Sequence, residues 1–142
     1  MSDTKKRVLF VCTHNAARSQ MAEGLLRTLA GDRYEVYSAG TEPSRVHPLA
    51  IAAMQELGID LSEHRSEHVD AYAGLQMDYV ITVCDNAKES CPYVPARERI
   101  LHRSFEDPSA TLGSGEERLA AFRRVRDEIK SWLETTFLHS TT

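Results

Sequence analysis

Residues 8–19 read VLFVCTHNAARS, and this stretch decides the fold. A run of apolar residues leads directly into Cys12, and Arg18 follows six positions later. A helical segment begins at once, so a thiol, a loop of backbone N–H groups and a helix N-terminus should meet at one point. Such a point attracts a tetrahedral oxyanion and favours the thiolate form of a cysteine beside it. The stretch therefore predicts an enzyme that attacks an oxyanion with sulfur.

Apolar runs and amphipathic segments alternate along the rest of the chain. Short apolar runs predict strands at residues 7–11, 34–38, 79–83 and 100–102, and helical spacing predicts helices at residues 19–30, 48–57 and 116–137. Continuous apolar strands are typical of burial on both faces. We therefore expect an α/β fold, with a four-stranded parallel sheet flanked by helices on each side in a flavodoxin-like order. The polar segment 60–72 is expected to be irregular.

The ends of the predicted strands place the candidate residues. Cys12, Cys84 and the loop around Asp107 each follow a predicted strand. Because ligands of open α/β sheets bind at the carboxyl ends of the strands, these residues should gather at one end of the sheet.

Length, charge and cysteine count limit the class of protein. The 142 residues fit one compact domain, so we expect a single domain over residues 1–142. The net charge of −4 gives no reason to expect nucleic acid as a partner, and no apolar run is long enough to span a bilayer. The polar residues 1–7 show no secretory signal, so we expect a cytoplasmic protein. In that reducing compartment the three cysteines should be thiols. Separately, we expect the protein to be a monomer.

The loop after the first strand carries most of the candidate residues. Cys12 is the candidate nucleophile, with a buried structural cysteine as the alternative. Arg18 can donate two hydrogen bonds to one anion, whereas a structural cation in a first helical turn would oppose the helix dipole. Asn15 and Ser19 are expected to hold the loop through side-chain hydrogen bonds, and Ser19 is also a candidate helix cap. His14 is expected to be a loop residue rather than a base.

These residues resemble a known family. The stretch from Cys12 to Ser19 resembles the phosphate-binding loop of the low-molecular-weight tyrosine phosphatase fold, and the wider match is to the thioredoxin-coupled arsenate reductases built on that fold. The matching segments are CTHN at 12–15, RSQMAEG at 18–24, YSAG at 37–40, VC at 83–84, CP at 91–92, DP at 107–108 and RVRDEI at 124–129.

The resemblance implies a role for each matched residue. It makes Cys12, Cys84 and Cys91 a redox triad, Arg18 the anion clamp and Asp107 the acid. The remaining loop residues would surround the substrate, arsenate or its analogues phosphate and sulfate: Thr13, His14, Asn15, Ala16, Ala17 and Ser19.

The chemistry of thiols and carboxylic acids agrees with these implied roles. Cys12 would attack arsenic while a hydroxyl leaves with a proton from Asp107, although Asp before Pro is also a common turn pair and Glu106 is a less favoured substitute. Cys84 would attack the Cys12 adduct and release arsenite, and Cys91 would then take over the disulfide. A thioredoxin-like or glutaredoxin-type donor would reduce that disulfide.

Two other functions stay open from the sequence. The first is hydrolysis of phosphate monoesters through a phosphocysteine on Cys12, with the other two cysteines only protecting it from oxidation. The second is a non-enzymatic thiol sensor or arsenic-binding protein, which Arg18 and Asp107 disfavour because binding alone needs no acid. Tyrosine phosphatases of this fold usually carry tyrosines after the Asp-Pro pair, whereas Ser109 and Ala110 follow here.

Metal ions are a separate question. Some members of the family bind potassium near the loop, and the matching positions here are Asn15, Ser19, Glu23, Ser38 and Glu67, the last of which is more usually aspartate. Cys84 and Cys91 have six residues between them, wider than usual zinc pairs. His64 and His68 lie among polar residues, which favours a solvated face.

Overall fold

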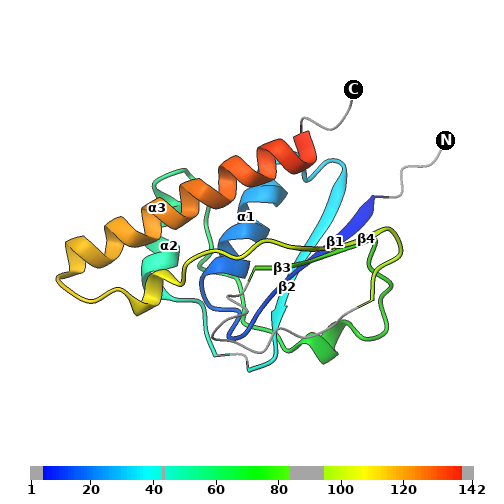
Figure 1. The fold of residues 1–142 in the computed structure, drawn as a ribbon, viewed down its shortest axis with the longest axis horizontal. Coiled ribbons are helices and arrows are strands. Elements are labelled where there is room, and N and C mark those ends of the chain that lie inside the picture. The colour runs from blue at the N-terminus through cyan, green and yellow to red at the C-terminus, as the bar shows by residue number, and fades with distance from the viewer. Residues whose placement is uncertain (1–4, 43, 84–94, 139–142) are drawn as a thin grey trace.

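The computed structural model describes residues 5–42, 44–83 and 95–138. Four strands and three α-helices form its frame, with shorter helical turns between them (Figure 1). In chain order the elements are β1 (Lys6–Cys12), α1 (Arg18–Ala30), β2 (Tyr34–Gly40), α2 (Pro48–Gln55), η1 (Val69–Tyr72), β3 (Tyr79–Thr82), β4 (Arg99–His102), η2 (Pro108–Ala110), α3 (Gly115–Leu133) and η3 (Glu134–Leu138).

The strands form one parallel sheet in the order β2-β1-β3-β4. β1 lies in its centre and pairs with β2 over its whole length, from Lys6 opposite Tyr34 to Cys12 opposite Gly40. This is the flavodoxin-like order that the sequence predicts. Parallel strands end at the same edge, so the loop after Cys12 and the segment after β4 leave the sheet on the same side.

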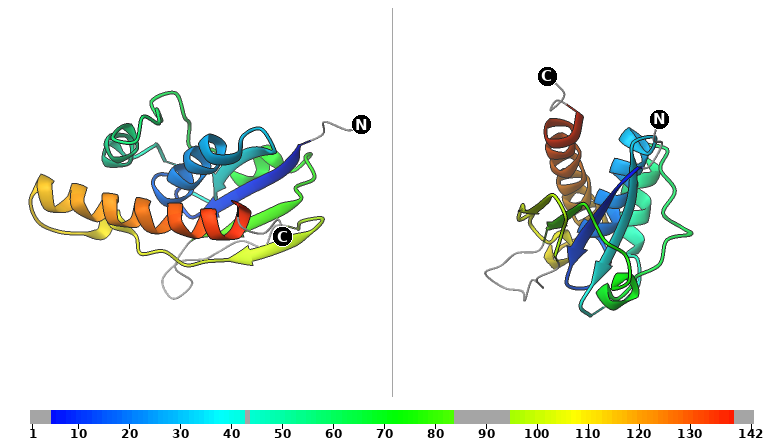
Figure 2. Two further views of the ribbon diagram at one scale, coloured as in Figure 1. Left: turned by 90° about the horizontal axis from the view of Figure 1, so that it is seen from above. Right: turned by 90° about the vertical axis from the view of Figure 1, so that its right-hand side faces the viewer.

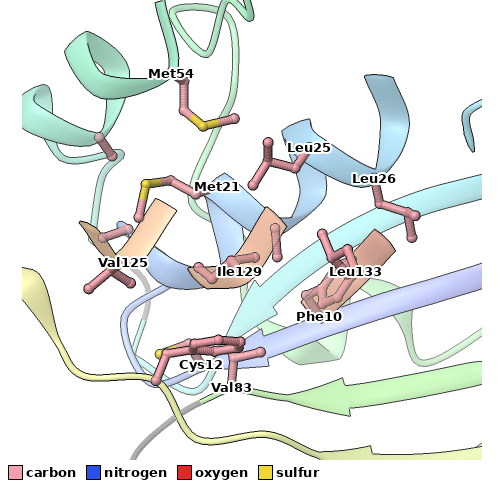
Figure 3. Close-up of a cluster of buried hydrophobic side chains, with 14 of the residues drawn as sticks. Phe10, Cys12, Met21, Leu25, Leu26, Met54, Val83, Val125, Ile129 and Leu133 are labelled. Atoms are coloured by element: carbon pink, nitrogen blue, oxygen red, sulfur yellow. The ribbon is translucent and has the colours of Figure 1, made fainter. Parts of the chain in front are cut away.

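Alternation along β1 divides the core into two clusters. Val8, Phe10 and Cys12 belong to the larger cluster, which also takes in the buried faces of α1, α2 and α3. Leu9 and Val11 point to the other face, into a smaller cluster. Figure 3 shows Phe10 and Cys12 beneath the apolar side chains of α1 and α3.

The longest helix, α3, extends from the site end of the molecule to the opposite end. It begins just after η2 with a capping box, in which Ser114 and Glu117 satisfy each other's backbone N–H groups. It runs alongside the sheet (Figure 2), and at its far end Phe137 of η3 packs on Tyr34 with ring centroids 5.2 Å apart. No helix in the described part of the chain is long and apolar enough to cross a membrane.

Helices flank both faces of the sheet: in the described residues the three α-helices pack into one cluster, and η1 packs with the other face. Three details differ from the sequence-based expectations. η1 also gives the polar segment 60–72 a helical turn. β4 is a largely exposed edge strand rather than a buried one. The C-terminal helix is regular only to Leu133, and η3 continues it as a wider π-helical turn that buries Phe137.

Candidate active site

A small cavity beyond the carboxyl end of β1 brings most of the predicted site residues together. Its volume is about 30 Å³, which suits a small anion rather than a large organic ligand. Its wall consists of Cys12, His14, Asn15, Ala16, Ala17, Arg18, His47, Asp107 and Ser109. Thr13 and Ser19 belong to the same loop but do not line the cavity.

The loop is held in shape by close backbone approaches. Asn15 has a φ of 49°, a left-handed conformation that asparagine tolerates better than most residues. Gly40 faces the start of the loop, and a Cβ atom there would lie 2.4 Å from the Thr13 carbonyl oxygen. Only glycine therefore lets β2 approach the loop this closely.

Side chains of α1 hold the same loop in place by hydrogen bonds. The Ser19 hydroxyl donates to Asn15 Oδ1 at 2.7 Å, which confirms that these two side chains are hydrogen-bonded. Ser19 is not the helix cap, because the N-cap position is Ala17 and no side chain caps it. Asn15 Nδ2 is buried without a hydrogen-bond partner among the described residues, a rare state that accompanies functional sites.

Gln20 is a support that sequence reasoning missed. Its fully buried amide donates to the Asn15 carbonyl oxygen at 3.1 Å and to the Arg65 carbonyl oxygen at 2.8 Å. Its own oxygen lies 3.0 Å from His64 Nδ1, so His64 is half-buried in a polar network and not on a solvated face. Arg65 and His64 lie far from Gln20 in sequence, and the only local signal is a polar residue on the buried side of an amphipathic helix.

The N-terminus of α1 and Arg18 supply positive charge at the cavity. The first N–H groups of α1 lack a side-chain cap, which leaves them available to an anion. Arg18 is only 4% exposed, and its guanidinium donates to the Phe105 carbonyl oxygen at 3.1 Å. Cys12, also 4% exposed, lines the same cavity. A buried cation and a helix N-terminus both favour a thiolate over a thiol.

Asp107 approaches this cluster from the other side of the cavity. Its Oδ1 accepts hydrogen bonds from the Ser109 backbone N–H at 3.0 Å and from the Ser109 hydroxyl at 2.7 Å, which caps η2. Its Oδ2 lies 3.8 Å from the Arg18 guanidinium. The turn interpretation and a role in the site are therefore compatible, because each uses a different oxygen. Neighbouring Glu106 instead pairs with Arg124 at 2.9 Å and does not line the cavity.

His47 is the second residue that sequence reasoning missed. It lines the cavity and caps the N-terminus of α2, and its backbone N–H donates to the Ala16 carbonyl oxygen at 2.9 Å. Burial lowers the pKa of His47 from its ordinary value, and Arg118 lowers it further while Asp107 raises it. The sequence signal that could have identified His47 is its position directly before Pro48, which begins a helix.

The side chains of Asn15, Ser19, Glu23 and Ser38, which match a potassium site, have protein partners in this arrangement. The Ser38 hydroxyl donates to Glu23 Oε1 at 2.5 Å, while Arg27 pairs with Glu23 Oε2 and donates to the Val36 carbonyl oxygen at 2.5 Å. Asn15 Oδ1 already accepts from Ser19. The Glu23 carboxylate is thus paired with a guanidinium.

Two predicted site residues, Cys84 and Cys91, lie outside the described residues. Within residues 5–42, 44–83 and 95–138, no group of three or more His, Cys, Asp or Glu side chains could hold a metal ion. The described site thus has the features of a class of protein whose cavity is suited to hold a tetrahedral oxyanion against a buried cysteine.

Comparisons with known proteins agree with this class. A family profile described as low molecular weight phosphotyrosine protein phosphatase matches residues 7–140. The arsenate reductase of Halalkalibacterium halodurans is 45% identical over 131 residues, which cover 92% of this chain and 94% of that protein. The structure of an arsenate reductase in the phosphate binding state has a TM-score of 0.79 at 36% identity, covering 94% of this chain and 98% of that chain. The thioredoxin-dependent arsenate reductase of Corynebacterium glutamicum has a TM-score of 0.69 at 28% identity, covering 99% of this chain and 66% of that chain.

The chain therefore belongs to the low molecular weight phosphotyrosine protein phosphatase family, and the relatives that it resembles there are arsenate reductases. The fold that the sequence resemblance implies is confirmed.

Proposed function

We propose that this protein reduces arsenate to arsenite with electrons from a thioredoxin-like donor. The observation that carries the proposal is the cavity that brings Cys12, Arg18 and Asp107 together at an uncapped helix N-terminus. Arsenate has the charge and tetrahedral shape of phosphate, so a loop of this kind can bind it. The names of the relatives, arsenate reductase and thioredoxin-dependent arsenate reductase, support the same substrate and donor.

The first step is attack by sulfur on arsenic. Arg18 and the helix N-terminus hold three oxygens of the anion, which leaves the fourth directed out of the loop. The Cys12 thiolate forms a bond to arsenic, and the hydroxyl opposite leaves as water after it takes a proton from Asp107. Oδ2 is the atom suited to carry that proton, because Oδ1 is occupied by Ser109.

The second step is the reduction itself. The Cys84 thiolate attacks Cys12 Sγ, the sulfur–arsenic electron pair passes to arsenic, and arsenite leaves with two more electrons than arsenate had. A Cys12–Cys84 disulfide results. Cys91 then attacks Cys84 and releases Cys12, and a dithiol donor reduces the Cys84–Cys91 disulfide. In support of the first exchange, Val83, the residue before Cys84, donates to the Val11 carbonyl oxygen at 3.0 Å and lies beside Cys12 in Figure 3.

The test is arsenate-dependent oxidation of NADPH in the presence of thioredoxin and thioredoxin reductase. We expect turnover that disappears in Cys12→Ser and that is lower when a glutaredoxin system replaces thioredoxin. If neither system oxidises NADPH faster with arsenate than without it, the proposal is overturned.

Hydrolysis of phosphate monoesters is the second candidate, and one observation favours it. The described site places a cysteine, an arginine and an acid as that reaction also requires. The described lining residues, however, include no tyrosine, phenylalanine or tryptophan to pack on a phenyl ring, and Ser109 stands at the rim. We therefore expect any turnover of phenyl phosphate to be slow compared with arsenate reduction.

A potassium ion is not part of the proposal. Arg27 already neutralises Glu23, so we propose that the loop keeps its shape without the ion.

A further inference from the structure

His47 stands at a junction between the loop and α2. Its backbone N–H holds the Ala16 carbonyl oxygen at 2.9 Å, and its ring packs on Phe122 with centroids 4.7 Å apart. His47 also lines the cavity with Cys12 and Asp107. The residue is thus held through both its backbone and its ring at the anion site.

The hydrogen bond at the start of α2 selects the tautomer of His47. Pro48 has no N–H, so the first N–H group of this turn belongs to Leu49, and it donates to His47 Nδ1 at 3.0 Å. A nitrogen that accepts a hydrogen bond carries no proton, so the proton of the neutral ring must be on Nε2. Within the described chain, no hydrogen bond to another residue occupies Nε2, which leaves this N–H group available to a ligand.

The ring is suited to donate without adding charge. Its pKa is lowered, first by burial and then by Arg118, and Asp107 opposes these effects only in part. The neutral ring with its proton on Nε2 is therefore the favoured state at neutral pH. A neutral N–H group complements an anion whose charge is already matched by Arg18.

We propose that His47 Nε2–H donates a hydrogen bond to an oxygen of the bound oxyanion, and that His47 is therefore a substrate-binding residue of this site. The inference rests on the proposed function, since it deepens the anion site on which that function depends. His47 thus adds a donor at the N-cap of α2 to the donors from the loop and from Arg18.

Two substitutions separate this role from the helix cap. In His47→Asn, the side-chain oxygen can still accept from the Leu49 N–H, but no donor reaches the Nε2 position. In His47→Gln, an amide N–H can reach roughly the Nε2 position while the cap is lost. Binding of inorganic phosphate, measured by calorimetry, should weaken about tenfold or more in the Asn variant and stay closer to wild type in the Gln variant. Thermal stability should show the reverse order.

His68 offers a matched control. Its Nδ1 accepts from the Asp70 N–H at 3.0 Å at the start of η1, the same local arrangement, but it does not line the cavity. His68→Asn should leave phosphate affinity unchanged. In wild type, the NMR resonances of the His47 Nε2–H group should shift when phosphate is added.

The outcomes distinguish the inference from the function beneath it. If wild type binds phosphate but His47→Asn binds it equally well, the inference is overturned while the proposed function stands. A His47 Nε2–H resonance that does not move on saturation with phosphate overturns the inference in the same way. If wild type binds neither phosphate nor arsenate, both fail together.

Discussion

Asp107→Asn is the substitution that tests the proposed acid most directly. In the folded protein, Oδ1 of Asp107 accepts two hydrogen bonds from Ser109, and Oδ2 lies 3.8 Å from Arg18. An asparagine can keep its oxygen toward Ser109, because that position needs only an acceptor. Its amide nitrogen then takes the place of Oδ2. The variant thus retains the cap of η2 and loses only the group that can give up a proton.

The expected magnitude follows from that single loss. General acid assistance is typically worth about a hundred- to ten-thousand-fold in rate, or about 2.7–5.4 kcal/mol in activation free energy. Stability should change little, because asparagine and aspartate are comparable caps. Asp107→Ala should lose the rate and also about 0.5–2 kcal/mol of unfolding free energy with the cap. Anion affinity should not fall in either variant, since a negative charge beside Arg18 is removed.

The assay is arsenite release in a single turnover, with phosphate binding and urea denaturation measured on the same samples. Glu106→Gln is the matched control, because that carboxylate neighbours Asp107 but pairs with Arg124 outside the cavity. It should leave the rate within about threefold of wild type. A loss below tenfold in Asp107→Asn, with an unchanged pH profile, would refute the assignment and make Glu106 the next candidate.

The remaining predictions concern the relay, the ion and the histidine. Cys91→Ser should release one arsenite per enzyme and then stop, and Cys84→Ser should release none; undiminished steady turnover with thioredoxin would contradict the relay. Wild type should melt at the same temperature in KCl and NaCl, whereas Arg27→Gln, which leaves Glu23 without its guanidinium partner, should be stabilised by KCl. A higher melting temperature of wild type in KCl would contradict the proposal that Arg27 makes the ion unnecessary. Because the pKa of His47 is lowered on folding, its contribution to stability is present above its unfolded value of about 6.5 and is lost as pH falls below it. Urea denaturation from pH 7 to about pH 5 should therefore show a shallower decline in His47→Asn.

The sequence predicts the centre of the fold better than its edges. β1 and β3 are continuous apolar runs that are buried on both faces, so their sequence pattern is strong. β4 has only two apolar residues, Ile100 and Leu101, and Ile100 is 46% exposed. An edge strand needs burial on fewer sides, so its local signal is weak by necessity.

Long-range contacts explain why part of the site was invisible. Cys12, Arg18 and Asp107 could be identified because each sits in a local pattern of strand, loop or turn. Gln20 and His64 meet across 44 positions of sequence, and no local pattern predicts that contact. His47 looks like an ordinary cap until Ala16 is seen to hold its backbone and Phe122 to pack on its ring.

The division between a phosphatase and a reductase on this fold depends on what attacks the Cys12 adduct. In the proposed mechanism the loop, Arg18 and Asp107 only make the adduct, and they would serve both reactions. Attack by water releases the anion unreduced, whereas attack by a thiol on Cys12 sulfur leaves two electrons on arsenic. Cys12 is 4% exposed, so the attacking group must arrive through a narrow opening. A second cysteine tethered to the chain has an effective concentration far above that of a free thiol. Attack by Cys84 should therefore dominate for arsenate, and Cys84→Ser should convert the protein into one that binds and exchanges oxygen with arsenate but never reduces it.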